Sequence, residues 1–320
     1  MKALVIAVWI GPLPGWFALW LRSAAGNPAL RFLLLTDQHV AGPLPANVNI
    51  AATDLATLSD TFSARLGFSV ALDQPYKLCD FKPLYWMLAP RLDDCDYWGF
   101  CDLDVIWGDL SPLLARTLGP FDAVLGEGHL RLFRNDEPCR ELYRHPAVPF
   151  DWRAALSSPM IMGLDEHPGI NHALAGGGFR WFADPQAVAD IDADFRQFRL
   201  VPQADNPRLQ AFRWEDGRVW RDSWRGGAAR SEEFLYIHFQ KRALRTDPAA
   251  LDAAAVAIDP GGIAARPAGP VTPSELARRN PWRWPNALEA RILLRERWRR
   301  LRGAPLPFPA TGSLAALPPK

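Results

Sequence analysis

The feature that most constrains the fold is a continuous apolar run at residues 3–10. A run this short, with no polar face, is typical of a strand that is buried on both sides of a parallel sheet. Residues 31–36 repeat the pattern, and further strands are predicted at 48–50 and 97–104. Apolar residues at helical spacing lie between them, most regularly at residues 55–66. The alternation predicts an α/β fold with a mainly parallel, Rossmann-like sheet flanked by helices.

The second half of the chain differs in composition. It is rich in aromatic residues and Arg, and Asp216-Gly217 predicts a tight turn between two strands of a hairpin. Residues 247–275 are rich in Ala, Pro and Gly, which predicts a linker or a loosely packed segment. A basic helix is predicted at 287–302. The predicted organisation is an α/β domain with a β-containing second half at residues 1–246, followed by a linker and helical tail at 247–320.

Charge and cysteine usage narrow the class of protein. The formal net charge is +1, with 36 basic and 35 acidic residues, so we expect no nucleic-acid partner. The four Cys form no CxxC pair, and we expect reduced thiols. The apolar N-terminal run imitates a short signal peptide, but Gly11 and Pro12 interrupt it and it is too short to span a bilayer. We therefore expect a cytoplasmic protein.

Two carboxylates interrupt the apolar segment YWGFCDLDVIWGDL at residues 97–110. Side chains alternate along a strand, so Asp102 and Asp104 point the same way while Leu103 points to the core. A bare carboxylate in apolar surroundings is costly unless it is paired or binds a cation. Two carboxylates at the C-terminal end of a strand can hold a hard divalent ion, so we predict Mn²⁺ or Mg²⁺ at this pair. The alternative is two Asp residues that cap a turn or a helix.

Four ordered motifs resemble one known family. They are YKLCDFKP at 76–83, WGFCDLDVIWGDL at 98–110, GHLRLFRN at 128–135 and YIHFQKR at 236–242. The set resembles a bacterial family of candidate glycosyltransferases that is catalogued as a domain of unknown function, and the resemblance covers residues 3–245. The layout is also distantly similar to the retaining GT-A glycosyltransferase families eight and thirty-two. The resemblance implies a GT-A-like fold, a nucleotide-sugar donor and a divalent metal.

The resemblance also implies roles for the metal and diphosphate ligands. Asp102 and Asp104 match the metal-binding DxD motif of these families. His238 and Lys241 resemble the late His-plus-Lys motif of family eight, which implies His238 as a third metal ligand and Lys241 at the diphosphate. The chemistry agrees, because imidazole is an acceptable ligand for Mn²⁺ and an ammonium group suits a phosphate. The alternatives are a buried strand histidine and a solvated lysine at a strand end.

Three further positions are implied as donor contacts. Asp80 and Lys82 lie in a helix predicted at residues 76–89, where the related families place residues that contact the nucleotide sugar. Those families more often have Arg at the position of Lys82. Asp37 follows the second predicted strand, at the position where the base and ribose would lie.

Two patches are candidates for the acceptor side and for the chemistry. His129 in EGHLRLFRN has a ring that can hydrogen-bond a sugar hydroxyl, and we include it among the substrate-binding candidates. Asp165 and Glu166 in GLDEHPG are the candidate catalytic carboxylates near the reacting carbon. The alternative for all three is a role as surface loop residues.

We interpret the chain as a glycosyltransferase, in particular a hexosyltransferase, that uses a nucleotide diphosphate-sugar. A divalent ion would stabilise the charge that forms on the departing diphosphate. The resemblance implies a saccharide or lipid-linked glycan as the acceptor, in the synthesis of a bacterial surface polysaccharide. Two alternatives remain: a non-catalytic carbohydrate-binding protein, and a metal-independent glycoside hydrolase that uses two carboxylates.

The basic helix predicted at 287–302 has two stripes. Arg291, Arg295, Arg299 and Arg302 share one stripe, and Leu294, Trp298 and neighbouring apolar residues share another. Such a helix is typical of a peripheral anchor, here on the inner face of the membrane. The alternative is a terminal helix that packs Leu294 and Trp298 on the domain and leaves the Arg residues in solvent.

Overall fold

Seven strands form the largest sheet of the computed structural model, in which residues 1–201, 206–302 and 310–318 are described. In spatial order they are β3 (Val48–Ala52), β2 (Leu30–Thr36), β1 (Ala3–Trp9), β4 (Tyr97–Cys101), β7 (Leu130–Arg134), β6 (Ala123–Val124) and β8 (Trp181–Phe182). The first four run parallel, β7 runs antiparallel to both β4 and β6, and β8 runs parallel to β6. The predicted α/β fold with a parallel-rich sheet is confirmed.

Alternate side chains of β1 enter different hydrophobic cores. Leu4 and Ile6 pack with Phe62 of α2 (Leu55–Leu66), whereas Val5 packs with Trp20 of α1 (Phe17–Ala25). Helices therefore cover both faces of the sheet, as a strand without a polar face requires. The other helices of this half are α3 (Leu78–Phe81), α4 (Ser111–Thr117), α5 (Glu137–Arg140), α6 (Trp152–Ser157) and α7 (Gly169–Gly176).

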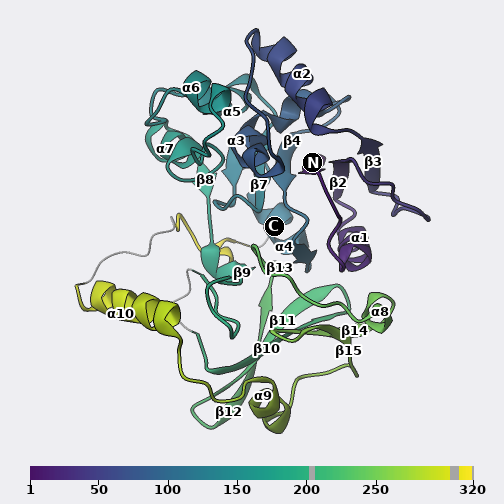
Figure 1. Ribbon diagram of the computed structural model, residues 1–320, viewed down its shortest axis with the longest axis vertical. Helices are drawn as coiled ribbons and strands as arrows, with labels where there is room; N and C mark the ends of the chain where they lie inside the picture. Colours follow the sequence, from purple (N-terminus) through teal and green to yellow (C-terminus); the bar gives the residue numbers. More distant parts are fainter. Residues whose placement is uncertain (202–205, 303–309, 319–320) are drawn as a thin grey trace.

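A second, antiparallel sheet forms the lower half of the molecule in Figure 1. Its strands, in spatial order, are β12 (Ala228–Phe234), β11 (Arg218–Arg225), β10 (Leu209–Glu215), β14 (Ala255–Asp259) and β15 (Gly262–Ala265). The β10–β11 hairpin turns at Asp216 and Gly217, whose φ angles are 51° and 75°. Positive φ at both central residues is what a type I′ turn requires, so the predicted hairpin is confirmed.

The linker expected at residues 247–275 is instead folded. It contains β14 and β15 together with α8 (Pro248–Leu251) and the start of α9 (Pro273–Arg279). Val256, Ile258 and Ile263 are buried in one core with Phe212 of β10. The prediction was wrong because Ala, Gly and Pro dominate the composition and conceal a short alternation of larger apolar residues.

A small three-stranded sheet joins the two halves. It consists of β5 (Val105–Trp107), β13 (Tyr236–His238) and β9 (Ala189–Asp190), with β13 in the middle. The strand predicted at 97–104 is therefore divided. β4 ends at Cys101, the chain turns through Asp102 and Asp104, and β5 pairs with β13 instead of with the large sheet. This turn places the two carboxylates at the junction of the sheets.

The C-terminal segment returns to the α/β half. Helix α10 (Ala287–Leu301) lies at the side of the molecule (yellow in Figure 1), where Glu289 pairs with Arg196 at 3.1 Å and Glu296 pairs with Arg199. Beyond it, the backbone N–H of Thr311 donates to the carbonyl of Ala183 at 3.0 Å, beside β8. Among the described residues, no helix has the length and apolar character that crossing a membrane requires.

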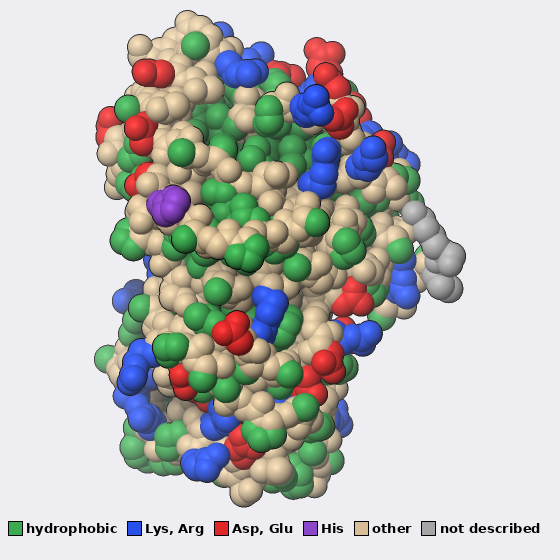
Figure 2. All heavy atoms as spheres, turned by 90° about the vertical axis from the view of Figure 1, so that its right-hand side faces the viewer, with side chains coloured by type: hydrophobic (Ala, Val, Ile, Leu, Met, Phe, Trp, Pro, Cys, Tyr) green, Lys and Arg blue, Asp and Glu red, His purple; other side chains and the backbone are tan. Residues whose placement is uncertain are grey.

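Figure 2 shows the face on the right-hand side of Figure 1, away from α10. Lys and Arg side chains on this face are interspersed with Asp and Glu side chains. This face therefore has no large region of a single charge sign, in keeping with the net charge of +1.

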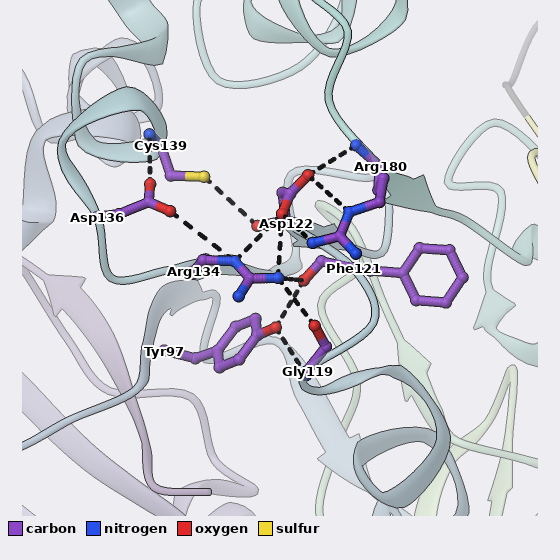
Figure 3. A network of polar contacts seen from close by, with 8 residues as sticks. All are labelled: Tyr97, Gly119, Phe121, Asp122, Arg134, Asp136, Cys139 and Arg180. Carbon is purple, nitrogen blue, oxygen red and sulfur yellow. Dashed lines mark hydrogen bonds and ion pairs between the residues drawn. The ribbon is translucent and has the colours of Figure 1, made fainter.

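A polar network ties four strands of the large sheet together (Figure 3). Asp122, next to β6, accepts hydrogen bonds from Arg134 of β7 and from the backbone and side chain of Arg180, next to β8. Tyr97 of β4 donates its hydroxyl hydrogen to the carbonyl of Phe121 at 2.6 Å. Burial acts to raise the pKa of Asp122, but the hydrogen bonds and charges of Arg180 and Arg134 outweigh it and lower this pKa.

Replacing Asp122 with Ala should lower the free energy of unfolding by roughly 1–3 kcal/mol, because two guanidinium groups lose their acceptor. A carboxylate with a lowered pKa stabilises the fold above its unfolded pKa of about 3.9, and this contribution is lost as the pH falls through the folded pKa. The difference between wild type and Asp122→Ala, measured by urea unfolding, should therefore shrink below about pH 4. Asp93→Ala, at an exposed position, is the control; an equal loss in both variants would contradict the network's role.

Candidate active site

A cavity of about 350 Å³ opens at the carboxyl ends of β1 and β4. The chain order reverses between these two neighbouring strands, because β2 and β3 lie on one side of β1 and β4 lies on the other. Open α/β sheets bind ligands at such a switch point. The lining residues come from the end of β1, the turn after β4 and two other segments: Val8, Trp9, Ile10, Pro75, Tyr76, Leu78, Cys79, Lys82, Tyr85, Asp102, Asp104, Gln240 and Lys241.

The predicted metal ligands converge at this cavity. Asp102, Asp104 and His238 each offer one ligand atom, and these atoms lie within 4.8 Å of one another. Backbone hydrogen bonds fix the turn: Asp102 N–H donates to the carbonyl of His129 at 3.2 Å, and Phe239 N–H donates to the carbonyl of Asp104 at 2.8 Å. The buried Oδ1 of Asp104 lies 3.3 Å from His238 Nε2 but has no partner with hydrogen-bond geometry among the described residues. An oxygen in this condition is available to a cation.

Asp190 orients His238 from the neighbouring strand. The two residues face each other in the parallel β13–β9 pair, and His238 Nδ1 lies 2.7 Å from Asp190 Oδ1. With Nδ1 bound to a carboxylate, Nε2 is directed to Asp104, as in the carboxylate–histidine arrangement of metal sites. Burial acts to lower the pKa of His238, but the negative charges of Asp104 and Asp190 and the hydrogen bond with Asp190 raise it well above its usual value. Asp190 belongs to no motif, and only the strand pairing reveals it.

His129 lies against the predicted metal ligand His238 and is not among the residues that line the cavity. Its ring stacks on that of His238 with centroids 4.2 Å apart, and its Nδ1 is hydrogen-bonded to Tyr236 Oη at 2.7 Å. Burial, together with the charge of His238, lowers the pKa of His129 well below its usual value, so the ring is neutral. Its Nε2 is buried and has no hydrogen-bond partner within the described parts of the chain. His129, Asp190 and His238 thus form a second cluster of ligand type, with atoms within 4.8 Å.

Lys82 is the central cation of the site. The helix expected at 76–89 consists of η1 (Pro75–Lys77), α3 and η2 (Lys82–Leu88), and Lys82 begins the last of these. Its buried Nζ lies 2.8 Å from Asp102, 3.5 Å from Asp165 and 2.9 Å from the carbonyl of Gly128. Burial acts to lower the pKa of Lys82, but the two carboxylates raise it well above its usual value. Lys82 therefore remains charged and positions the first carboxylate of the DxD turn.

The two candidate catalytic carboxylates, Asp165 and Glu166, lie in different environments. Asp165 is buried, and burial raises its pKa to about 7 against the opposing effect of Lys82. Glu166 is exposed and accepts a hydrogen bond from the backbone N–H of Gly128 at 3.1 Å. A Cβ at Gly128 would lie 2.9 Å from Asp165 Oδ2, so a larger residue here would displace the Asp165 carboxylate. Of the two carboxylates, Asp165 is the one that pairs with the ammonium group of Lys82.

Asp80 has a different environment from the one expected of a donor contact. It is fully buried and does not line the cavity. Its carboxylate accepts hydrogen bonds from Lys77 Nζ at 2.8 Å and from the backbone N–H groups of Met162 and Leu164, both at 2.9 Å. Asp80 therefore holds the loop that carries Asp165, and Lys77, which has no role in the sequence analysis, is its charge partner.

Lys241 lines the cavity, whereas Asp37 follows the carboxyl end of β2 and is not among the lining residues. Asp37 follows β2 and is exposed; its Oδ1 accepts hydrogen bonds from Gly11 N–H at 2.9 Å and from the side chain of Gln38 at 2.8 Å. Lys241 Nζ lies 4.6 Å from the ring centroid of Tyr76. The preceding residue, Gln240, has a φ of 51°, an uncommon conformation for a residue other than glycine. Both predicted donor contacts thus reach the side of the sheet where the cavity opens.

Besides Asp190, sequence reasoning missed a second buried acid of this region, Glu127. It lies two residues before His129, in a loop that begins at Leu125, whose φ is 68°. Burial raises the pKa of Glu127 to about 7, against the opposing charge of Arg131. Its Oε1 has no hydrogen-bond partner among the described residues. GEGH contains no sequence signal for burial, so only the structure identifies this carboxyl group.

Comparison with known proteins gives a family and a distant structural likeness. Residues 5–267 match a family whose description is "Family of unknown function (DUF6625)". No curated protein matches the chain in sequence. One similar solved structure is the apo form of the glycosyltransferase GlyE of Streptococcus pneumoniae TIGR4, with 14% identity, 58% of this chain and 46% of that chain covered, and a TM-score of 0.31. The chain thus spans less than half of that structure.

Replacing Lys82 with Met should lower the free energy of unfolding by about 3–5 kcal/mol, because two carboxylates lose a buried partner. The loss should be smaller at pH 5 than at about pH 8, since protonation of Asp165 removes one unpaired charge. Chemical denaturation at both pH values measures it. Lys241→Met, at an exposed lysine of the same cavity, should change stability by no more than about 0.5 kcal/mol.

Replacing Asp190 with Asn should weaken Mn²⁺ binding by roughly 10–100-fold, because the His238 ring loses the carboxylate that orients it. Isothermal titration with Mn²⁺ measures the effect on the folded protein. Asp192→Asn, two residues along and directed elsewhere, should bind Mn²⁺ like wild type. Equal affinity of wild type and Asp190→Asn would show that Asp190 does not act on the metal site.

Proposed function

This chain belongs to the family of unknown function DUF6625, and we propose that it is a metal-dependent glycosyltransferase with a nucleotide diphosphate-sugar donor. The observation that carries the proposal is the cluster of Asp102, Asp104 and His238 at the cavity between β1 and β4. A cation site and a ligand cavity at the switch point of an α/β sheet are what a nucleotide diphosphate requires.

The ligand set suits Mn²⁺ or Mg²⁺, with a preference for Mn²⁺. Two carboxylates are ligands for any hard divalent ion, and the imidazole of His238 favours Mn²⁺ over Mg²⁺. Asp104 Oδ1, which has no hydrogen-bond partner among the described residues, supports this fit. When bound, the ion supplies charge stabilisation to the diphosphate as it departs from the sugar.

The chain's own residues would position the donor around this site. Lys82 holds Asp102 and adds a fixed positive charge at the cavity wall. Lys241 at the mouth is the candidate contact for the diphosphate, and Asp37 after β2 is the candidate contact for the base or ribose. The cavity volume of about 350 Å³ lies within the roughly 300–1,000 Å³ that is usual for small-molecule sites.

The reaction we propose is hexosyl transfer on a GT-A-like fold. Asp165 is the better placed of the two candidate carboxylates, since it is buried beside Lys82 whereas Glu166 is exposed. His129 would act through the His238 ring on which it stacks, instead of contacting a sugar hydroxyl. The acceptor class is a saccharide or lipid-linked glycan of bacterial surface polysaccharide synthesis, which rests on the family resemblance. The corresponding location is the cytoplasm, at the inner face of the membrane.

Thermal shift with nucleoside diphosphates and nucleotide sugars, with and without Mn²⁺, tests this function. A specific donor should raise the melting temperature only when Mn²⁺ is present. At a donor concentration of a hundred times its dissociation constant, binding should stabilise the folded state by about 2.7 kcal/mol. Asp104→Asn should abolish this Mn²⁺-dependent shift, and transfer with a confirmed substrate pair, while circular dichroism shows that the variant is folded.

The matched control is Asp109→Asn, which retains the side-chain oxygen that accepts from Ser111 N–H. This variant should behave like wild type. Donor binding that needs no metal, or undiminished transfer by Asp104→Asn, would refute the metal assignment. Binding of glycans without any nucleotide response would favour a carbohydrate-binding protein.

A further inference from the structure

The exposed tryptophans of this chain are concentrated in one short stretch. Of its 14 Trp residues, three are exposed, and all three lie in the 17 residues from Trp282 to Trp298. Trp282, Trp284 and Trp298 are 65%, 78% and 58% exposed. Large apolar side chains are costly to leave in water, so such clustering indicates a surface that binds something.

Helix α10 turns its apolar stripe away from the protein. Its contacts with the body include the ion pairs of Glu289 with Arg196 and of Glu296 with Arg199. On the other side, Leu294 and Leu301 are 63% and 78% exposed. The alternative in which Leu294 and Trp298 pack on the domain is therefore wrong, because the ion pairs fix the polar face inward.

A basic stripe accompanies the apolar one. It consists of Arg291, Arg295, Arg299 and Arg302. These four side chains are exposed, and none makes an ion pair with a described residue. Both Glu residues of α10 are already paired with Arg196 and Arg199, so the outward face of the helix is strongly cationic. The opposite face of the molecule, shown in Figure 2, instead mixes acidic and basic side chains.

The segment directly before α10 adds two of the exposed tryptophans, Trp282 and Trp284. Trp282 and Trp284 share a hollow of about 320 Å³ with Leu293 of α10. We call the set formed by Trp282, Trp284, Leu294, Trp298, Leu301 and the four Arg residues the tryptophan–arginine surface. It combines rings that favour the interfacial zone of a bilayer with guanidinium groups that pair with phosphate.

We propose that the tryptophan–arginine surface docks this protein on an anionic membrane. The apolar residues enter the boundary between headgroups and acyl chains, and the arginines contact lipid phosphates. The chemistry selects a negatively charged lipid surface over a second copy of the chain, since two such cationic surfaces would repel each other. The proposal does not depend on the glycosyltransferase assignment, although docking would bring a lipid-linked acceptor to the enzyme.

Flotation of the full-length protein with vesicles tests the proposal. Wild type should float with vesicles of phosphatidylcholine and phosphatidylglycerol, and much less with phosphatidylcholine alone or in high salt. Arg291→Gln/Arg295→Gln should lower partitioning by roughly 10-fold or more, since each charge near an anionic surface contributes about fivefold. Trp282→Ser/Trp284→Ser should also lower it.

The matched control removes two exposed arginines from other surfaces, Arg65→Gln/Arg230→Gln, and should float like wild type. Circular dichroism establishes that each variant is folded. Three results would overturn the proposal: no flotation of wild type, equal flotation of all variants, or equal binding to neutral vesicles. A dimer in light scattering that the Trp variants dissociate would also overturn it, in favour of a second copy.

Discussion

The ammonium group of Lys82 is wedged between Asp102 and Asp165, and much of the site depends on this buried arrangement of charge. Removing a charged group from water is expensive, and the cost is offset only when partners surround it at short distance. The partners come from separate parts of the chain: the turn after β4, the loop that Asp80 anchors, and the Gly128 carbonyl. The three segments are therefore stable in these positions only together. A divalent cation beside them would complete the neutralisation of the carboxylates.

The placement of β13 is the second constraint. This strand pairs with β5 on one side and β9 on the other. Its Tyr236 is buried in a core of the α/β half and its Ile237 in the core of the antiparallel half, so it joins the two. The same pairing brings His238 next to Asp190 and within reach of Asp104. The backbone hydrogen bonds of β13 thus stabilise the junction of the two halves and also set the geometry of the site. Strand pairing thus fixes the side of the site that carries the predicted metal ligands, whereas Lys241 and Asp37 are exposed.

The two proposals concern different parts of the molecule. The metal site lies in the carboxyl-end cavity of the large sheet, whereas the tryptophan–arginine surface lies on α10 and the segment before it. Buried ion pairs dominate the first and exposed unpaired charges dominate the second. This contrast matches their proposed ligands: a small multiply charged donor needs a preorganised cavity, and a lipid surface needs an accessible face with both apolar and cationic side chains.

The sequence by itself determined the α/β class, the hairpin at Asp216-Gly217 and the DxD pair, because these follow from local periodicity, turn chemistry and the cost of isolated carboxylates. It also singled out His238 and Lys82, through motifs that span only a few residues. Tertiary structure alone decided that Asp190 orients His238, that Asp80 holds a loop and that residues 247–275 belong to a sheet. It also decided which side of α10 faces the protein. These outcomes depend on strand register and on contacts between residues far apart in the chain. Neither can be predicted from a local sequence pattern.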